Sequence, residues 1–103
     1  MMKYFCEECD IGLDKLIDAV AMEMKKKLRR KHDEGYHGWD DIHFVQELWE
    51  KFEEHVDRGL EKDNMIDIMN LAAFLWNMAD DAKEMNMLPA VTMRGFSEEI
   101  HGE

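Results

Sequence analysis

The chain has 103 residues, of which 46% are hydrophobic and 36% are charged, and its formal net charge is −11. This length suits a single domain, 1–103, and the hydrophobic fraction is that of a folded protein rather than a disordered one. A strongly acidic surface repels phosphodiester backbones and anionic lipid, which argues against nucleic acid and membranes as the main partners.

The sequence contains no stretch of ~18–20 continuous apolar residues that could span a bilayer, and residues 1–10 lack the apolar centre of a signal peptide. We therefore expect a cytoplasmic protein. A lone Cys-x-x-Cys motif, Cys6 and Cys9, has no second Cys or His pair to complete a zinc site. Two reduced thiols near a terminus are the simpler interpretation, and a metal or redox role is the alternative.

The first predicted helix runs from about Ile11 to Lys31. Its apolar residues recur at spacings of three and four: Leu13, Leu16, Ile17, Val20, Met24 and Leu28. Its last turns carry a basic cluster, which the negative end of the helix dipole favours: Lys25, Lys26, Lys27, Arg29, Arg30 and Lys31. The sequence Asp33-Glu34-Gly35 then ends the helix.

The second predicted helix covers roughly Asp41 to Arg58, after a glycine-rich loop that holds Trp39. Asp40 or Asp41 suits the N-cap position, and Gly59 suits the residue that ends the helix. One face of this helix is apolar: Val45, Leu48, Trp49, Phe52 and Val56. Acidic side chains lie on or near the opposite face: Glu47, Glu50 and Glu54. Glu53 lies at the flank of the apolar stripe.

The third predicted helix begins after Asp63 as N-cap and reaches about Asn86. From Met65 to Trp76, ten of twelve residues are apolar. A helix that is apolar nearly all round must be covered on every side, which two partner helices of one short chain do not achieve. We therefore predict an all-α antiparallel bundle of three main helices and a short helical segment near residues 96–100, completed as a homodimer or homotetramer. Residues 1–10 and 87–103 are peripheral.

Polar side chains inside the third helix share a face, because Asp63, Asp67 and Asn70 are spaced four and three apart. Glu50 shares a face of the second helix with Glu53 or Glu54 in the same way. If the two helices are neighbours, these oxygens converge on a site that suits Mg²⁺. Two carboxylates about 5 Å apart repel by roughly 3 kcal/mol at an effective dielectric of about 20, so such a cluster requires a cation. The alternative is that water solvates the carboxylates apart.

The order of three sequence features resembles the all-α nucleoside triphosphate pyrophosphohydrolase superfamily, the MazG-like proteins. These features are Gly38-Trp39, then Glu50-Lys-Phe-Glu53-Glu54-His55, then Asp67-Ile-Met-Asn70 followed by an apolar run. The family motif is Glu-x-x-Glu on one helix and Glu-x-x-Asp on the next. The resemblance covers about residues 25–80.

Under this resemblance Asp67 matches the Asp of the second motif, and Glu50 with Glu53 fits the first. The pairs Glu47/Glu50 and Glu54/Asp57 satisfy nearly the same spacing. The chain departs from the family at Asn64, where the family has Glu. Asp63, one residue earlier, is the substitute ligand that the spacing allows.

The resemblance implies hydrolysis of a nucleoside triphosphate between its α- and β-phosphates, with Mg²⁺, or Mn²⁺ in its place, as cofactor. The catalytic residues implied are Glu50 and Glu53, and the metal ligands implied are Glu50, Glu53, Glu54, Asp63 and Asp67. The nucleotide contacts expected are Asn70, Lys27, Arg30, Lys31 and Trp39. The basic run is alternatively a solvated helix end, and Trp39 alternatively packs over a helix start.

Two other functions remain open from the sequence. One is a non-catalytic, oligomeric nucleotide-binding or regulatory bundle on the same scaffold, which the departure at Asn64 favours. The other is a protein-interaction bundle that has no small-molecule site.

Overall fold

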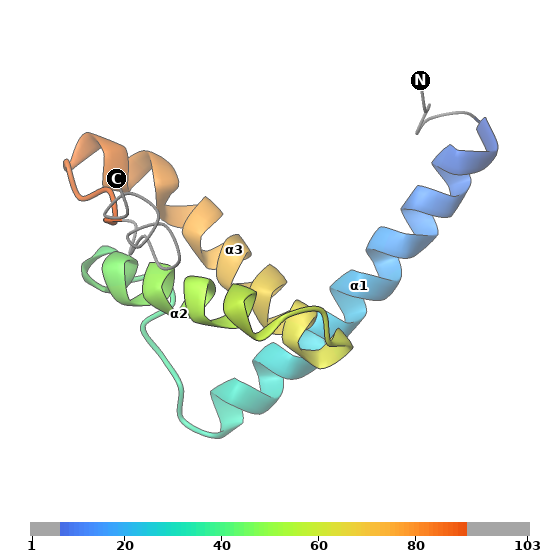
Figure 1. The fold of residues 1–103 in the computed structure, drawn as a ribbon, viewed down its shortest axis with the longest axis horizontal. Helices are drawn as coiled ribbons and strands as arrows, with labels where there is room; N and C mark the ends of the chain where they lie inside the picture. Colours follow the sequence, from blue (N-terminus) through green and yellow to red (C-terminus); the bar gives the residue numbers. More distant parts are fainter. Residues whose placement is uncertain (1–6, 91–103) are drawn as a thin grey trace, which may run out of the picture. The chain divides into compact units, whose positions relative to one another are not determined.

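The computed structural model describes residues 7–90, with side chains from residue 11 onward, and this part of the chain is all-α (Figure 1). It contains no strand. Its elements, in chain order, are α1 (Glu7–Asp33), the 3₁₀ helix η1 (Ile42–Phe44), α2 (Val45–Arg58) and α3 (Lys62–Glu84). The three main helices predicted from the sequence are therefore confirmed.

Two units make up the chain, and the division between them falls after His37. The first unit contains α1, and the second contains η1, α2 and α3. None of the helices within residues 7–90 has the length and apolar character needed to cross a membrane. The helical segment predicted near residues 96–100 lies outside the described residues, as do Cys6 and the side chain of Cys9.

The first helix is longer than its apolar stripe predicts, with bounds of Glu7–Asp33 rather than Ile11 to Lys31. The added first turn carries acidic residues, which interact favourably with the positive end of the helix dipole. The acidic turn adds no aliphatic residue to the periodic pattern. The start of the helix predicted from that pattern is therefore too late in the sequence.

Both long helices end in a residue of left-handed backbone conformation, Gly35 after α1 and Asn86 after α3, with φ values of +96° and +56°. In each case the following amide donates to a carbonyl five residues earlier, at 3.1 Å after Gly35 and 2.7 Å after Asn86. This closure satisfies carbonyl groups that the helix itself leaves without partners. Asn replaces Gly in the second case because its short side chain tolerates this conformation.

The start of the second helix is built as a short 3₁₀ turn rather than as a continuous α-helix from Asp41. The Asp41 carboxylate accepts a hydrogen bond from the backbone N–H of His43 at 2.9 Å, so Asp41 is the N-cap of η1. The capping role predicted for Asp41 is therefore confirmed, while α2 itself begins four residues later, at Val45.

The N-cap predicted for the third helix is wrong. The helix begins at Lys62, its N-cap position is Glu61, and Asp63 already lies within the first turn. The reason is that Gly59, with φ of +95°, ends α2 and turns the chain back within a few residues. A carboxylate in the first turn still suits the helix dipole there.

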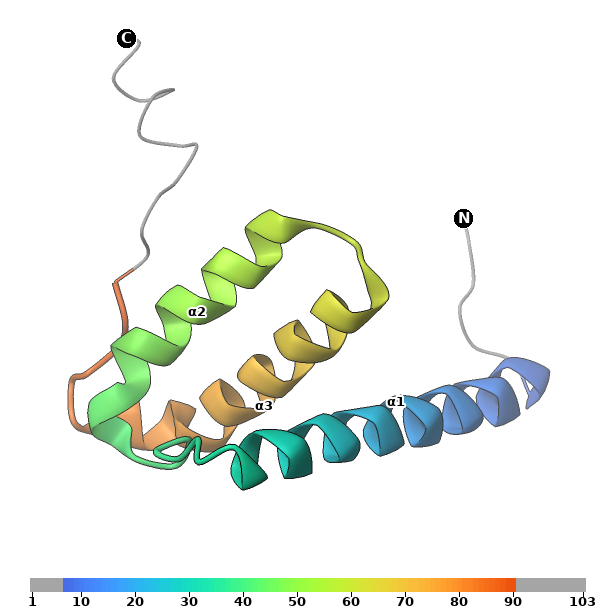
Figure 2. The ribbon, with the colours of Figure 1, turned by 90° about the horizontal axis from the view of Figure 1, so that it is seen from below.

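The second and third helices pack against each other in opposite directions, joined by the turn around Gly59 (Figure 2). The centre of their contact is a cluster of three buried residues, Val45, Met78 and Ala82. Partly buried side chains surround it: Ile42, Leu48, Leu75 and Met87. This contact confirms the antiparallel pairing of the two helices that carry the candidate site.

Met78→Ala tests this core, because Met78 is only 3% exposed. Removing its side chain from the α2–α3 contact is expected to lower the free energy of unfolding by about 2–5 kcal/mol. Urea unfolding followed by circular dichroism measures the change. Met85→Ala is the matched control, since Met85 is 53% exposed, and its effect is expected to stay within about 0.5 kcal/mol. Equal effects of the two substitutions would contradict the assigned core.

The cap at Asp41 makes the stability of the protein depend on pH under acid conditions. Hydrogen bonds from the backbone and then the side chain of His43 hold the pKa of Asp41 below its ordinary value of 3.8. Because the folded-state pKa is depressed, the contribution of Asp41 to stability is present above the unfolded-state pKa and is lost as the pH falls through the folded-state pKa.

An NMR titration of the Asp41 carboxyl carbon checks this. The pKa should lie below 3.8 in the wild type and rise only partway in His43→Ala, because the backbone donor remains. A wild-type pKa at or above the ordinary value would show that the cap is not formed in solution.

Candidate functional site

Asp67 is the candidate site residue that the helix pairing places beside α2. It lies in the second turn of α3, and its Oδ2 is 3.8 Å from Nδ1 of His55 on α2. The two side chains are only 22% and 16% exposed. A carboxylate from α3 therefore faces α2 instead of bulk water, as a site shared between the two helices requires.

Asn64 joins the end of α2 to the start of α3. Its side-chain amide donates to the carbonyl oxygens of His55 and Gly59, both at 2.7 Å. Its Oδ1 lies 2.8 Å from Nδ1 of His55. Since this oxygen can only accept, the His55 ring must donate through Nδ1. Asn64 is 7% exposed, so it is a buried structural residue whose amide is already engaged.

These hydrogen bonds give Asn64 a structural role of its own. At the position where the resemblance places a Glu ligand, the chain uses an amide that both donates and accepts hydrogen bonds. A carboxylate there could not donate to the two backbone carbonyl groups. Position 64 therefore stabilises the turn between the helices.

The acidic residues of α2 differ in their exposure. Glu50 is exposed, and its Oε2 accepts a hydrogen bond from the side-chain amide of Gln46 at 3.0 Å. Glu54 is also exposed, as is Asp63 on α3, whereas Glu53 is half-buried. Glu53 thus lies at the flank of the apolar stripe, where the sequence predicted it, and is the most shielded of the predicted α2 ligands.

Gln46 also fastens the segment that follows α3. Its Oε1 accepts a hydrogen bond from the backbone N–H of Ala90 at 2.7 Å, and its Nε2 lies 3.2 Å from the carbonyl oxygen of Ala90, to which it donates. One side chain therefore engages both backbone groups of Ala90 and the carboxylate of Glu50. This arrangement fixes the exit of the chain against the start of α2.

Among the side chains of residues 11–90, no three or more His, Cys, Asp or Glu side chains lie close enough together to hold one metal ion. The five predicted ligands are therefore not gathered around a common point within the described part of one chain. Their chemistry is that of Mg²⁺ ligands, because all five supply hard carboxylate oxygens. The metal-binding roles of these five residues stay predictions. The residues are Glu50, Glu53, Glu54, Asp63 and Asp67.

Trp39 packs against Phe74 of α3, with ring centroids 5.6 Å apart and an angle of 35° between the ring planes. The loop reaches this position through Gly38, whose φ is +94°. A Cβ atom on Gly38 would lie 2.9 Å from the ring of Phe44, so both the conformation and the space require glycine. Trp39 remains 47% exposed, which leaves part of its surface open to a planar ligand.

The remaining predicted nucleotide contacts lie in two different elements. Asn70 is buried in α3, one turn beyond Asp67. Lys27, Arg30 and Lys31 lie in the last turns of α1, where the Lys31 ammonium group sits 4.8 Å from the centre of the Tyr36 ring. A cation over an aromatic face is a favourable contact in its own right. The roles of these side chains toward phosphate stay predictions.

Comparisons with protein-family models, with curated proteins and with solved structures gave no match to this chain.

Asn64→Asp tests the structural role of the buried amide. The substitution replaces two donated hydrogen bonds with an acceptor facing two carbonyl oxygens, and it should lower the free energy of unfolding by about 1–3 kcal/mol. Chemical denaturation provides the measurement. Lys62→Ala, an exposed neighbour at the start of α3, is the control and should have little effect. If Asn64→Asp proved as stable as the wild type, the hydrogen bonds assigned to Asn64 would not hold the turn.

Proposed function

We propose that this chain is a cytoplasmic, Mg²⁺-dependent nucleoside triphosphate pyrophosphohydrolase of the MazG-like kind. The reaction would cleave the bond between the α- and β-phosphates and release a nucleoside monophosphate and pyrophosphate. Support comes from the order of the motifs along the sequence. It comes also from the antiparallel contact of α2 and α3, the two helices on which those motifs lie.

The observation that carries the proposal is the position of Asp67. An aspartate within an apolar helix is costly unless its carboxylate has polar partners or a cation. Asp67 is half-buried and faces His55 across the α2–α3 contact. An acidic group held in this shielded position on the motif that resembles the family is suited to bind a divalent cation.

The carboxylates of this chain suit a Mg²⁺ site with one or two protein ligands, and not a site with four or five. Mg²⁺ commonly binds one or two protein carboxylates and completes its octahedron with water and substrate phosphate oxygens. Asp67, with Glu53 as the most shielded acid of α2, suits that kind of site. A cage of four or five carboxylates does not fit the side chains of residues 11–90. When bound, Mg²⁺ would neutralise negative charge on the phosphates and on the departing pyrophosphate.

The chain's own residues would then provide orientation. The open part of Trp39, backed by Phe74, offers an aromatic surface on which a base can stack. Asn70 carries both hydrogen-bond donors and acceptors, and it lies one turn from Asp67 on the same side of α3.

A second function, nucleotide binding without hydrolysis, is favoured by Asn64. Its amide is committed to the carbonyl groups of His55 and Gly59, so the ligand that the family places at this position is missing. A protein with fewer ligands could retain a cation and a nucleotide while losing the geometry that orients the attacking water.

Mg²⁺ binding to the wild type and to Asp67→Ala distinguishes the two proposed functions, hydrolysis and nucleotide binding, from a protein-interaction bundle with no small-molecule site. Isothermal calorimetry should detect Mg²⁺ binding to the wild type and at least tenfold weaker binding to Asp67→Ala, because an anionic ligand is lost. Asp80→Ala is the matched control, since Asp80 is an exposed aspartate on the same helix. No Mg²⁺ uptake by the wild type would contradict both proposed functions.

Hydrolysis is tested by measuring pyrophosphate release from a panel of nucleoside triphosphates. The enzyme proposal expects equal amounts of pyrophosphate and nucleoside monophosphate from at least one substrate, and a rate at least about 100-fold lower in Asp67→Ala. Mg²⁺ binding without pyrophosphate from any nucleotide would overturn the hydrolase and support the binding protein.

A further inference from the structure

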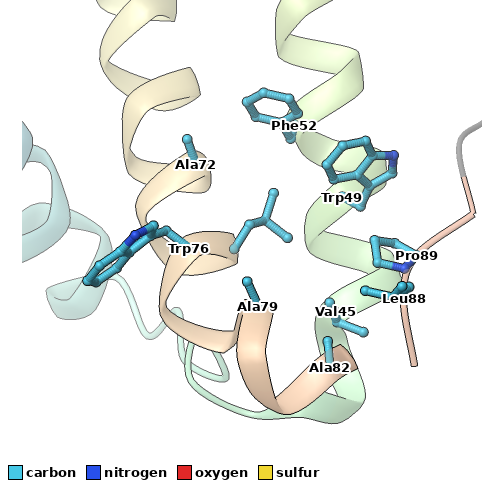
Figure 3. Close-up of a pocket in the computed structure, with 10 residues that line it drawn as sticks. Val45, Trp49, Phe52, Ala72, Trp76, Ala79, Ala82, Leu88 and Pro89 are labelled. Atoms are coloured by element: carbon cyan, nitrogen blue, oxygen red, sulfur yellow. The ribbon is translucent and has the colours of Figure 1, made fainter. Parts of the chain in front are cut away.

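The segment that follows α3, residues 87–90, lies against α2, and we call it the strap. It begins where the backbone N–H of Met87 donates to the carbonyl oxygen of Ala82 at 2.7 Å. Its next two residues, Leu88 and Pro89, line an apolar pocket of about 370 Å³ between α2 and α3 (Figure 3). All residues that line this pocket belong to the second unit. The strap is therefore one wall of the pocket.

One side chain of α2, Gln46, holds the far end of the strap. Its Oε1 accepts a hydrogen bond from the backbone N–H of Ala90 at 2.7 Å, and its Nε2 donates to the carbonyl oxygen of Ala90 at 3.2 Å. The second hydrogen of Nε2 is donated to Oε2 of Glu50 at 3.0 Å, which fixes the orientation of the amide. Leu88 is 64% exposed and Pro89 has no N–H to donate, so the hydrogen bonds of Gln46 provide a large share of the attachment.

Trp49 lies three residues after Gln46, on the same side of α2. Figure 3 shows its indole ring close to Pro89, and both residues line the pocket. The indole Nε1 is buried and has no hydrogen-bond partner within the part of the chain that the structure describes. A buried N–H without an acceptor is unfavourable, because it has lost its hydrogen bond to water. Opening of the strap would relieve this by letting water reach the indole.

We propose that the strap opens as a unit separate from the α2–α3 core, with Gln46 as its latch. Two opposing interactions set its position. The hydrogen bonds of Gln46 to Ala90 favour the closed form, and hydration of the Trp49 N–H favours the open form. Closing completes the wall of the apolar pocket, and opening exposes the pocket to solvent. Local openings of this kind require less free energy than global unfolding. The device operates whether or not the chain hydrolyses a nucleotide.

Hydrogen exchange of the full chain, followed by NMR, tests the latch in the variant Gln46→Met. Methionine keeps a side chain of similar length and removes the amide group. In the wild type, the Ala90 amide and the Trp49 indole N–H should share one opening equilibrium, which should be more favourable than that of the core amide of Met78.

In Gln46→Met, exchange at Ala90 and at the Trp49 indole should be at least about fivefold faster, because two hydrogen bonds to the strap are lost. The Met78 amide should change by less than about twofold. The Trp49 signal is the decisive one, since Gln46 makes its hydrogen bonds to Ala90 and Glu50 rather than to the indole.

The matched control is Glu47→Ala, because Glu47 is the exposed neighbour of Gln46 on α2. This variant should leave exchange at Ala90 and Trp49 within about twofold of the wild type. The indole of Trp76 is an internal reference, since Trp76 is 81% exposed and its N–H should exchange without protection. Circular dichroism checks that the helices persist. If Gln46→Met lost helicity, Gln46→Glu should release the strap in the same way, because a carboxylate cannot donate to the Ala90 carbonyl.

Two results would overturn the proposal. If the Trp49 indole N–H exchanged only at the opening free energy of the Met78 amide, the strap would not open separately from the core. If Gln46→Met accelerated exchange at Ala90 but not at Trp49, the strap would not be the element that shields the indole.

Discussion

The contact between α2 and α3 is the interaction on which the rest of the molecule depends. Val45, Met78 and Ala82 bury the apolar side of this contact near one end of the pair, and Asn64 closes the other end through hydrogen bonds to His55 and Gly59. Because both ends are fixed, the rotation of α3 about its axis is fixed as well. That rotation turns Asp67 toward α2.

Sequence reasoning recovered the features that depend on local chemistry. The three helices follow from hydrophobic periodicity, and the ends at Gly35 and Gly59 follow from the need for positive φ. The errors arose where a distant residue decides the outcome. Asp63 has the right chemistry for an N-cap, but after the sharp turn at Gly59 the helix starts two residues earlier, with Glu61 as its N-cap. The role of Asn64 depends on its meeting with His55, which no local pattern encodes.

The candidate site illustrates the same limit. The sequence placed Glu53 at the flank of the apolar stripe of α2, and the half-buried position of Glu53 agrees with that prediction. Spacing did not reveal which faces of α2 and α3 meet, so it could not predict that Asp67 faces His55 of α2. The apolar pocket between α2 and α3 was likewise foreseen only as a general need of α3 to be covered, and the residues that line it were not predicted.

The most direct test of this account is native-state hydrogen exchange of the amides in α2 and α3. If the two helices form one cooperative unit held by their shared core and by Asn64, the slowest amides of both should exchange with the same opening free energy. Destabilising the unit at Asn64 should lower both values equally. Fast exchange throughout α2, with α3 still protected, would show that the helices are stable separately and would contradict the arrangement that positions Asp67.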